Sequence, residues 1–260
     1  MTGAVIARDE ASSIRGCLES LSWADELLVV LDDRTTDATE AISRQLTDRV
    51  FVHPFANFPT QRNIAIGLVR TEWVFFVDAD ERVTPELAAE LRQAIAARGD
   101  FEPSGYWVPR RNIIWGRWIR HGGWYPDYQL RLLRRDRARY DEAREVHELV
   151  LLDGAAGHLR EPFVHYNYAS VAQFVAKQRA YSTLDARVLL NKGLRPRMRS
   201  FVLQPLREFN RRYFVHQGFR DGPHGLLLAA LLAYFTFATY WKLWRLTRGT
   251  RPHRSNEGER

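Results

Sequence analysis

The sequence predicts an α/β fold in which a doubly wound, mostly parallel sheet is followed by a C-terminal helical extension. Over the first 100 residues, short apolar runs alternate with helix-like periodicities, which is the β-α order of a parallel sheet. From residue 105 apolar runs follow one another without such helices, and after residue 170 the pattern is helical almost to the end. We therefore expect one domain over residues 1–168 and a helical, basic extension over 169–260.

Four apolar runs mark the strands of the parallel half. The run at 27–31 contains no polar residue, which suits a strand that is buried on both faces. Helix starts follow from local signals, because Ser12 or Ser13 precedes an i, i+3, i+4, i+7 apolar pattern and Thr84 stands before a proline. The expected strands are 4–7, 27–31, 50–52 and 73–77, and the expected helices begin near residues 13, 37, 60 and 84.

The segment after residue 105 has a different pattern. Apolar and aromatic runs predict strands without intervening helices, and a loop rich in glycine, tryptophan and histidine separates the first two. These features indicate a mixed edge of the same sheet that carries long loops. The expected strands are 106–114, 128–133, 146–152 and 163–168, and the loop is 115–126.

Composition and charge limit the class of protein. With 260 residues, of which 45% are hydrophobic and 27% charged, the chain is too apolar to be disordered and too polar to cross a membrane many times. Its single cysteine, Cys17, excludes a disulfide scaffold and a zinc site built from cysteines. Residues 1–100 carry 10 basic and 17 acidic side chains, whereas residues 101–260 carry 28 and 14. The second part therefore has either a solvated basic surface or a surface that faces a polyanion, namely lipid headgroups or nucleic acid.

Acidic residues follow two of the predicted strands. Asp32 ends the second apolar run, and Asp78-Ala79-Asp80 ends the fourth. Ligands of open α/β sheets bind beyond the carboxyl ends of the strands, and the two acids of an Asp-x-Asp sequence project to one side. Such a pair suits a hard divalent cation that also binds phosphate oxygens, although acids at strand ends also cap turns. The chain has no Gly-x-Gly-x-x-Gly, P-loop or Gly-x-Ser-x-Gly motif, which excludes three other classes of site.

Several short motifs together resemble glycosyltransferase family 2, and in particular its bacterial lipopolysaccharide-core glucosyltransferases. The motifs are VIARDE at 5–10, CLESL at 17–21, WADE at 23–26, VVLD at 29–32, TDAT at 36–39, QRN at 61–63, the DADER that ends 73–82, the segment 117–133, VHE at 146–148 and HY at 165–166. The resemblance implies a GT-A-type fold, a nucleotide-diphosphate sugar as donor and a Mn²⁺ or Mg²⁺ ion.

The resemblance also implies a set of site residues. Carried over position by position, it assigns donor binding to Glu10, Asp32, Arg62, Asn63 and Asp78, and metal binding to Asp80 and Asp78. Asp32 would read the base. The family often has a glycine at the position of Arg34, so the turn after Asp32 departs from the pattern.

Inverting sugar transfer needs a base that takes the proton of the acceptor hydroxyl while the diphosphate leaves. Asp127 is the first candidate because it immediately precedes a predicted strand, and Arg131 falls on the same strand face, where it would meet the diphosphate. Glu148 is the rival base, and His147 is either a third metal ligand or an ordinary hydrogen-bonded histidine. The tryptophans of the 115–126 loop either pack in the core or form a stacking platform for the acceptor sugar; they are Trp115, Trp118 and Trp124.

Residues 226–241 form an uncharged run that spans roughly 24 Å as a helix, less than the ~30 Å hydrocarbon core. Residues 191–260 carry 14 basic and 4 acidic side chains. This combination predicts attachment to an anionic membrane surface, with burial against the enzyme domain as the alternative. Because residues 1–10 lack the apolar run of a secretion signal, we expect a cytoplasmic chain that is peripheral on the inner face of the plasma membrane.

These observations predict an inverting, metal-dependent glycosyltransferase that moves a sugar to a glycan or lipid-linked acceptor such as a core oligosaccharide. A polyprenyl-phosphate sugar synthase is the alternative within the same chemistry. A basic nucleic-acid-binding module is the alternative outside it, and no nucleic acid is expected because the acids at the strand ends would repel phosphates.

Overall fold

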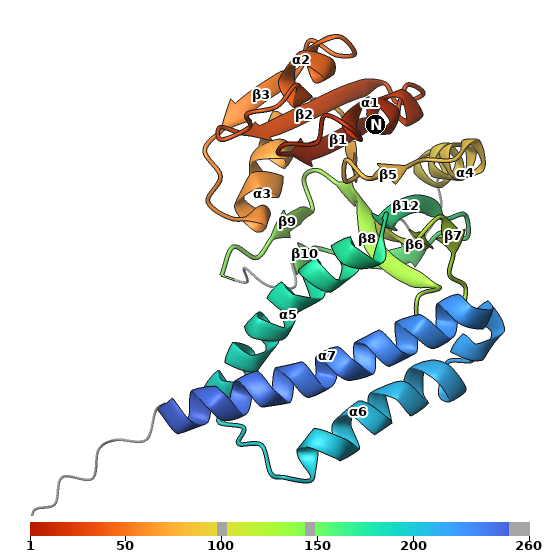
Figure 1. Cartoon of the computed structure of the whole chain (residues 1–260). Helices are drawn as coiled ribbons and strands as arrows, with labels where there is room; N and C mark the ends of the chain where they lie inside the picture. Colours follow the sequence, from red (N-terminus) through yellow and green to blue (C-terminus); the bar gives the residue numbers. More distant parts are fainter. Residues whose placement is uncertain (98–102, 144–148, 250–260) are drawn as a thin grey trace, which may run out of the picture. The chain divides into compact units, whose positions relative to one another are not determined.

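The computed structural model describes residues 1–97, 103–143 and 149–249 (Figure 1). The chain divides into two compact units. The first consists of Met1–Ile113 and Pro126–Asn167, and the second consists of Ile114–Tyr125 and Tyr168–Arg260. The expected domains are 1–168 and 169–260, whereas the second unit begins its last stretch at Tyr168 and also includes the segment 114–125.

The first unit contains the predicted parallel sheet. Its strand order begins β3-β2-β1-β4, and all three of these pairings are parallel. The strands are β1 (Thr2–Ala7), β2 (Glu26–Asp32), β3 (Val50–His53) and β4 (Trp73–Phe76), and the helices between and after them are α1 (Ile14–Ser20), α2 (Thr39–Arg44), α3 (Phe58–Leu68) and α4 (Pro85–Ala96). The β-α order predicted from the apolar runs is confirmed.

Side-chain capping explains where α3 and α4 begin, whereas Ser13 before α1 and Ala38 before α2 form no side-chain cap hydrogen bond. Thr84 caps α4 as predicted, since its hydroxyl accepts a hydrogen bond from the Leu87 N–H at 3.2 Å. Thr60 was expected to start the third helix, but α3 begins two residues earlier. Its cap is Asn57, whose side chain accepts from the Thr60 N–H at 2.8 Å, followed by Pro59 in the first turn.

The sheet continues with antiparallel strands. β4 pairs with β8 (Asp127–Arg134), β8 pairs with β6 (Gly105–Ile114), and β12 (Phe163–Tyr168) pairs with β5 (Glu81–Arg82). The mixed edge expected after residue 105 is therefore present for β6, β8 and β12. The expected strand 146–152 was placed in the wrong sheet, because β10 (Val150–Leu152) pairs with β9 (Ala138–Tyr140) in a separate two-stranded sheet, and residues 146–148 lie outside the described residues. Short strands that the sequence did not predict are β5, β7 (Arg117–Trp118), β9 and β11 (Ala156–His158).

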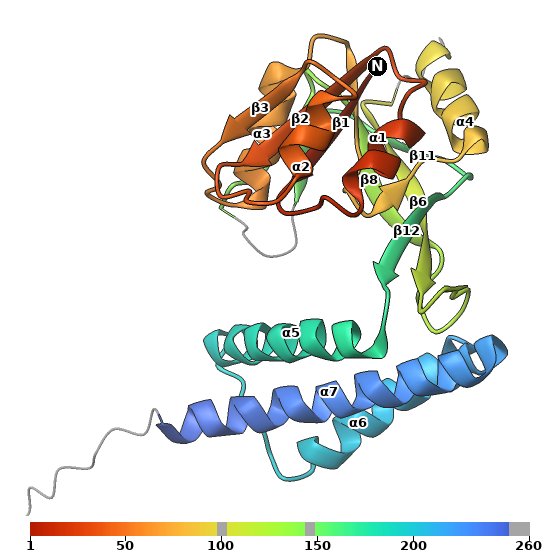
Figure 2. The same ribbon diagram turned by 45° about the horizontal axis from the view of Figure 1, so that its top comes forward.

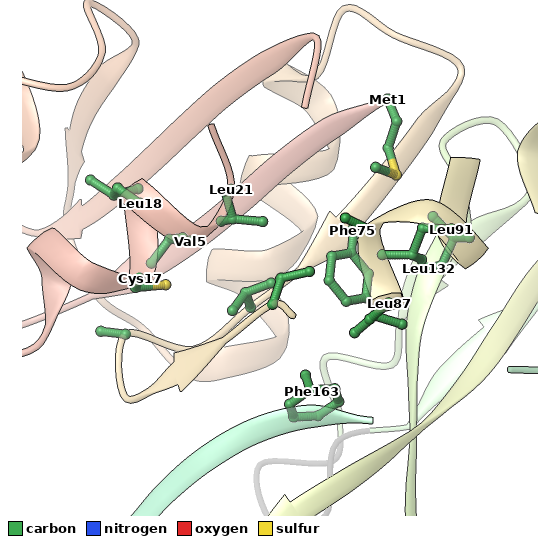
Figure 3. Packing of buried hydrophobic residues seen from close by; sticks show 14 of the residues in the cluster. Met1, Val5, Cys17, Leu18, Leu21, Phe75, Leu87, Leu91, Leu132 and Phe163 are labelled. Atoms are coloured by element: carbon green, nitrogen blue, oxygen red, sulfur yellow. The ribbon is translucent and has the colours of Figure 1, made fainter. Parts of the chain in front are cut away.

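The central strands are buried on both faces, as the apolar run at 27–31 predicted. In β1, Val5 joins the cluster that packs against α1 and α4, whereas Ala4 and Ile6 join the cluster that packs against α3. Figure 3 shows the first of these clusters, with Cys17 and Leu18 of α1 and Leu87 of α4 among its fully buried or nearly fully buried side chains. Each such leucine stabilises the fold by roughly 1.5–3 kcal/mol relative to an exposed one. The sheet edge that carries the acids is thus fixed on a rigid scaffold.

The second unit is helical, as predicted. It contains α5 (Val171–Asn191), α6 (Ser200–Asn210), a π-helical turn η1 (Arg211–Val215), a 3₁₀ turn η2 (Gly218–Asp221) and α7 (Gly222–Gly249). α7 runs alongside both α5 and α6 (Figure 2). Its core contains Ile114 and Ile119 from the 114–125 segment together with Phe174, Leu228 and Phe235.

The apolar helix is longer than its uncharged run of sixteen residues suggested. α7 has 28 residues, or about 42 Å of helix, because it continues past Lys242. By length and composition, Gly218–Arg248 is able to cross a membrane, and only 28% of its most apolar window is buried. That low fraction argues against the alternative that this helix is mainly a core helix.

Candidate active site

The predicted acids lie at neighbouring strand ends in the first unit. Asp32 is the last residue of β2, and Asp78 follows β4 by two residues. β1 lies between these strands and pairs in parallel with both. Because neighbouring strands are about 4.8 Å apart, the two strand ends are roughly 10 Å apart on one edge of the sheet. The sheet topology therefore brings the two predicted acidic positions to the same edge.

Asp32 is almost completely buried and ion-paired. Its two carboxylate oxygens accept hydrogen bonds from the Arg34 Nε and Nη2 at 3.0 and 2.9 Å, and the Arg34 backbone N–H adds a third at 2.9 Å. The hydrogen bonds from Arg34 lower the pKa of Asp32 to about 2. The Arg34 guanidinium also lies 5.5 Å from the ring centre of Phe55. Arg34, which departs from the family pattern, therefore covers the Asp32 carboxylate, which is predicted to recognise the base of the nucleotide.

Glu10 lies on a loop that is tied to the turn after β2. The Glu10 N–H donates to the Thr39 hydroxyl at 2.7 Å, and the Asp9 carboxylate accepts from the Thr36 N–H at 2.8 Å. Asp9 has a φ of +52°, a conformation that aspartate tolerates better than most residues. These bonds hold the loops after β1 and β2 together, so Glu10 and Asp32 belong to one structured edge.

Asp78 is held by two arginines from different elements. Its Oδ1 accepts from Arg62 Nη2 of α3 at 2.9 Å, and its Oδ2 accepts from Arg131 Nη2 of β8 at 2.6 Å. The positive charges of Arg131 and Arg62 outweigh the effect of burial and hold the pKa of Asp78 well below its usual range. Its side chain remains 34% exposed, so a ligand can reach the group. Two cationic side chains are therefore fixed beside a strand end.

Glu81 is a buried acid that the sequence analysis did not single out. Its side chain is 1% exposed, accepts from Arg131 Nη2 at 3.2 Å and accepts from the Asp78 N–H at 2.9 Å. Burial raises the pKa of Glu81 to about 7, against its ordinary value of 4.5. Glu81 thus acts as a support on which Arg131 and the Asp78 backbone are positioned.

A chain of polar contacts joins Asp80 to Asp127. His165 Nε2 lies 3.3 Å from the Asp80 carboxylate, and His165 Nδ1 lies 2.8 Å from Asn112 Oδ1. Asn112 Nδ2 in turn donates to Asp127 at 3.2 Å, and Arg110 donates to the same Asp127 oxygen at 2.8 and 2.5 Å. The metal-ligand and base candidates therefore share one network.

This network fixes the tautomer of His165. Because the Asn112 amide nitrogen donates to a carboxylate, its oxygen is the atom that faces His165, and Nδ1 of a neutral His165 must carry the hydrogen. In this neutral form Nε2 presents a lone pair towards the Asp80 carboxylate at 3.3 Å, whereas a protonated ring would donate a hydrogen bond to it. Two electron-pair donors that face each other in this way fit a divalent cation, and a nitrogen and an oxygen donor both suit Mn²⁺.

The remaining predicted residues have varied surroundings. Asn63 is bonded to the β9 backbone, since its amide donates to the Tyr140 carbonyl at 3.0 Å and accepts from the Tyr140 N–H at 2.8 Å. Glu148 and His147 lie outside the described residues. Within residues 1–97, 103–143 and 149–249, no three side chains of His, Cys, Asp or Glu gather as a complete metal site. Any cation there would need ligands beyond Asp80 and His165. The three predicted tryptophans, Trp115, Trp118 and Trp124, belong to the second unit.

Sequence reasoning missed Arg110, Asn112 and His165 as site residues, although one signal was available. Arg110 and Asn112 alternate along β6, as Asp127, Gln129 and Arg131 alternate along β8, so each set lies on one strand face. The sequence does not show that β12 pairs with β5. This pairing sets His165 opposite Glu81 and next to Asp80.

Comparisons with known proteins place the chain among glycosyltransferases. The model of the family "Glycosyl transferase family 2" matches residues 4–163. The chain is 30% identical over 244 residues to the lipopolysaccharide core biosynthesis glycosyltransferase LpsC of Rhizobium meliloti, covering 90% of this chain and 87% of the relative. It is 24% identical to an uncharacterized glycosyltransferase of Rickettsia bellii, covering 90% and 82%. Among solved structures, the mannosyltransferase PcManGT of Pyrobaculum calidifontis, in complex with GDP-Man and Mn²⁺, aligns with 97% of this chain and 76% of its own at 13% identity and a TM-score of 0.48.

Proposed function

The chain belongs to glycosyl transferase family 2 and is a glycosyltransferase, and we propose that it transfers a sugar, with inversion, from a nucleotide-diphosphate donor to a lipid-linked or core-oligosaccharide acceptor of the cell envelope. The observation that carries the proposal is the pairing of Arg62 and Arg131 with Asp78 at the strand edge that also holds Asp32. The similarity to LpsC, a lipopolysaccharide core biosynthesis enzyme by name, supports this class of acceptor.

The donor is expected to bind along the strand ends. Asp32 and Glu10 lie on the β2 and β1 side, where the nucleoside would bind, and the two arginines lie on the β4 side, where the diphosphate would bind. A guanidinium donates through five N–H groups, so one that already pairs with Asp78 can also donate to a phosphate oxygen. Fixed cations of this kind stabilise the charge that develops on a leaving diphosphate.

Asp80 and His165 are the residues that would hold a divalent cation. When bound, Mn²⁺ or Mg²⁺ supplies positive charge to the diphosphate oxygens. The contribution of the chain is to fix the two donors, because Asn112 orients the His165 ring and the Asp80 carbonyl accepts from the Tyr166 N–H at 2.9 Å. Both oxygens of Asp78 accept hydrogen bonds from Arg62 and Arg131. The role of Asp78 is therefore to hold these two positive charges in place.

Asp127 is the proposed base. Its carboxylate is 28% exposed, and it is held by Arg110, Asn112 and Gln129 rather than by packing. These donors fix the direction of the carboxylate but leave part of it open to an acceptor hydroxyl. The proton would pass from the hydroxyl to Asp127 as the oxygen attacks the anomeric carbon. Glu148, the rival, lies outside the described residues.

The second unit is proposed to attach the enzyme to an anionic membrane surface. No residue of α6 is buried, and apolar side chains on α6, η1 and α7 are exposed, namely Val202, Leu203, Leu206, Phe214, Val215, Tyr234, Phe237 and Trp241. Exposed apolar residues flanked by Arg195, Arg197 and Arg199 match an interfacial helix on anionic lipids. In flotation with anionic liposomes, the double substitution V202E/L206E should abolish binding, whereas L184E on α5 should not. Equal binding of both variants would refute the attachment.

A panel of nucleoside diphosphates tests the catalytic proposal. Thermal unfolding should shift upwards with one nucleotide when Mn²⁺ is present, and the shift should disappear in D80A, because a ligand that binds only the folded state stabilises it. D136N, a substitution at an exposed acid elsewhere on the first unit, is the matched control and should retain the shift. The absence of any metal-dependent shift across the panel would refute the proposal.

A further inference from the structure

The second unit contains a cationic cavity that the proposed reaction does not use. Its volume is about 430 Å³, and it is lined by Arg117, Trp118, Arg120, His121, Arg220 and Asp221. This volume falls within the range of small-molecule sites. None of the lining residues belongs to the strand-edge site of the first unit.

The arginines of the cavity are available to a ligand. Arg117, Arg120 and Arg220 are exposed, and within the described part of the chain no carboxylate lies at ion-pair distance from any of their guanidinium groups. Among the described residues, the Arg220 guanidinium donates only to the Gln217 side chain, at 2.9 Å. Three guanidinium groups around one cavity, with no acidic partner for any of them, favour an anionic ligand.

Asp221, the acidic residue of the cavity wall, is bonded to the loop that carries Arg117 and Arg120. Asp221 is buried, and its carboxylate accepts from the Arg120 and His121 backbone N–H groups at 3.3 and 2.8 Å and lies 3.2 Å from His121 Nδ1. These contacts tie the loop that carries Arg117 and Arg120 to the turn that carries Arg220. Asp221 therefore builds the cavity and does not pair with its arginines.

Two further features restrain parts of the cavity wall. The Arg120 guanidinium lies 4.1 Å from the centre of the Trp118 ring, which restricts its position. A Cβ built on Gly225 would meet the Gly218 carbonyl oxygen at 1.9 Å, so the first turn of α7 lies directly against η2. A preorganised set of arginines loses less conformational entropy when it binds an anion than a set of mobile surface arginines does.

We propose that this cavity is a binding site for a phosphate group, either in the headgroup of an anionic lipid or on a phosphorylated acceptor. Guanidinium groups recognise phosphate through paired N–H···O bonds, and three of them around one cavity match the three terminal oxygens of a phosphomonoester. The cavity includes Arg220 and Asp221, immediately before α7, the helix whose length and composition suit a membrane. A phosphate at a lipid surface would therefore lie where the apolar helix starts.

The test uses the full chain and two triple variants of equal charge. One is R117Q/R120Q/R220Q in the cavity, and the control is R137Q/R139Q/R160Q, at exposed positions of the first unit. The soluble probe is glycerol 3-phosphate, titrated by phosphorus NMR at constant ionic strength. The lipid probes are vesicles of phosphatidylcholine alone and of phosphatidylcholine with phosphatidic acid, used in flotation.

The cavity variant should lose glycerol 3-phosphate affinity by about 10-fold or more, and the control should not. Loss of phosphatidic acid binding as well identifies a lipid headgroup as the source of the phosphate, whereas loss of glycerol 3-phosphate binding alone identifies a soluble or acceptor phosphate. Equal losses in both variants, or no loss in either, would overturn the proposal. Nucleoside diphosphate binding, measured in the same variants, should be unchanged, so failure of this site and failure of the proposed transferase are distinguishable.

Discussion

The guanidinium of Arg34 covers the carboxylate of Asp32 with two side-chain hydrogen bonds, and a third comes from its backbone N–H. Asp32 is therefore negatively charged at any pH near neutrality, with a pKa of about 2. A nucleoside that approaches Asp32 meets Arg34 first, because the Arg34 side chain is 53% exposed whereas that of Asp32 is 4% exposed.

Replacing Arg34 by glycine should strengthen nucleotide binding. The substitution removes a competitor for the Asp32 oxygens, so affinity for the preferred nucleoside diphosphate should rise by about 2–5-fold. Calorimetric titration measures this change, with R44G, at a surface pair of α2, as the control. A fall in affinity in R34G alone would mean that Arg34 itself binds the nucleotide.

Removing the imidazole of His165 should weaken metal binding without abolishing the fold. If Nε2 is a ligand, H165A should raise the Mn²⁺ concentration for half-maximal activity by about 10–100-fold. H158A, at an exposed histidine on β11, should leave it unchanged. The metal dependence of initial rates is the measurement, and an unaltered Mn²⁺ requirement in H165A would exclude His165 as a ligand.

D127N distinguishes two kinds of acceptor. If the acceptor is a hydroxyl, loss of the base should lower kcat by about 10²–10⁴-fold with little change in the KM for the donor. An acceptor that is already a phosphate needs no base, and turnover would then change little. Steady-state rates with a hydroxyl and a lipid-phosphate acceptor separate the two. N112A removes an amide that donates to Asp127 but keeps the Asp127 carboxylate, so it tests whether positioning alone accounts for the loss.

Glu81 makes stability depend on pH in a direction opposite to that of ordinary salt-bridged acids. Its folded pKa of about 7 lies above its ordinary value of 4.5, so between these values the folded state binds more protons than the unfolded state. The stability of the wild type should therefore fall as the pH rises from about 4.5 to 7 through this group. E81Q should flatten that part of the profile of melting temperature against pH, and an identical slope in E81Q and the wild type would contradict the assignment.

The parallel half of the fold was predictable because its strands are buried on both faces and its helices carry local start signals, as Thr84 and Pro85 illustrate. The acids at the strand ends followed from the same reasoning. The support of the site was not predictable, because Glu81 and His165 meet only through the pairing of β5 with β12, two strands that lie more than 80 residues apart in sequence. The amide of Asn63, which the sequence assigned to donor binding, is bonded to the backbone of β9, and its role at the donor stays a prediction.

The segment Ile114–Tyr125 has a practical consequence for anyone who wishes to study the catalytic unit in isolation. Ending the chain at residue 167 would leave Ile114 and Ile119 without Phe174, Leu228 and Phe235, the side chains that cover them. Such a fragment would contain an internal loop, residues 114–125, whose apolar side chains are exposed to solvent, and it would tend to aggregate. An isolated first unit therefore needs two cuts, with a short polar bridge replacing residues 114–125.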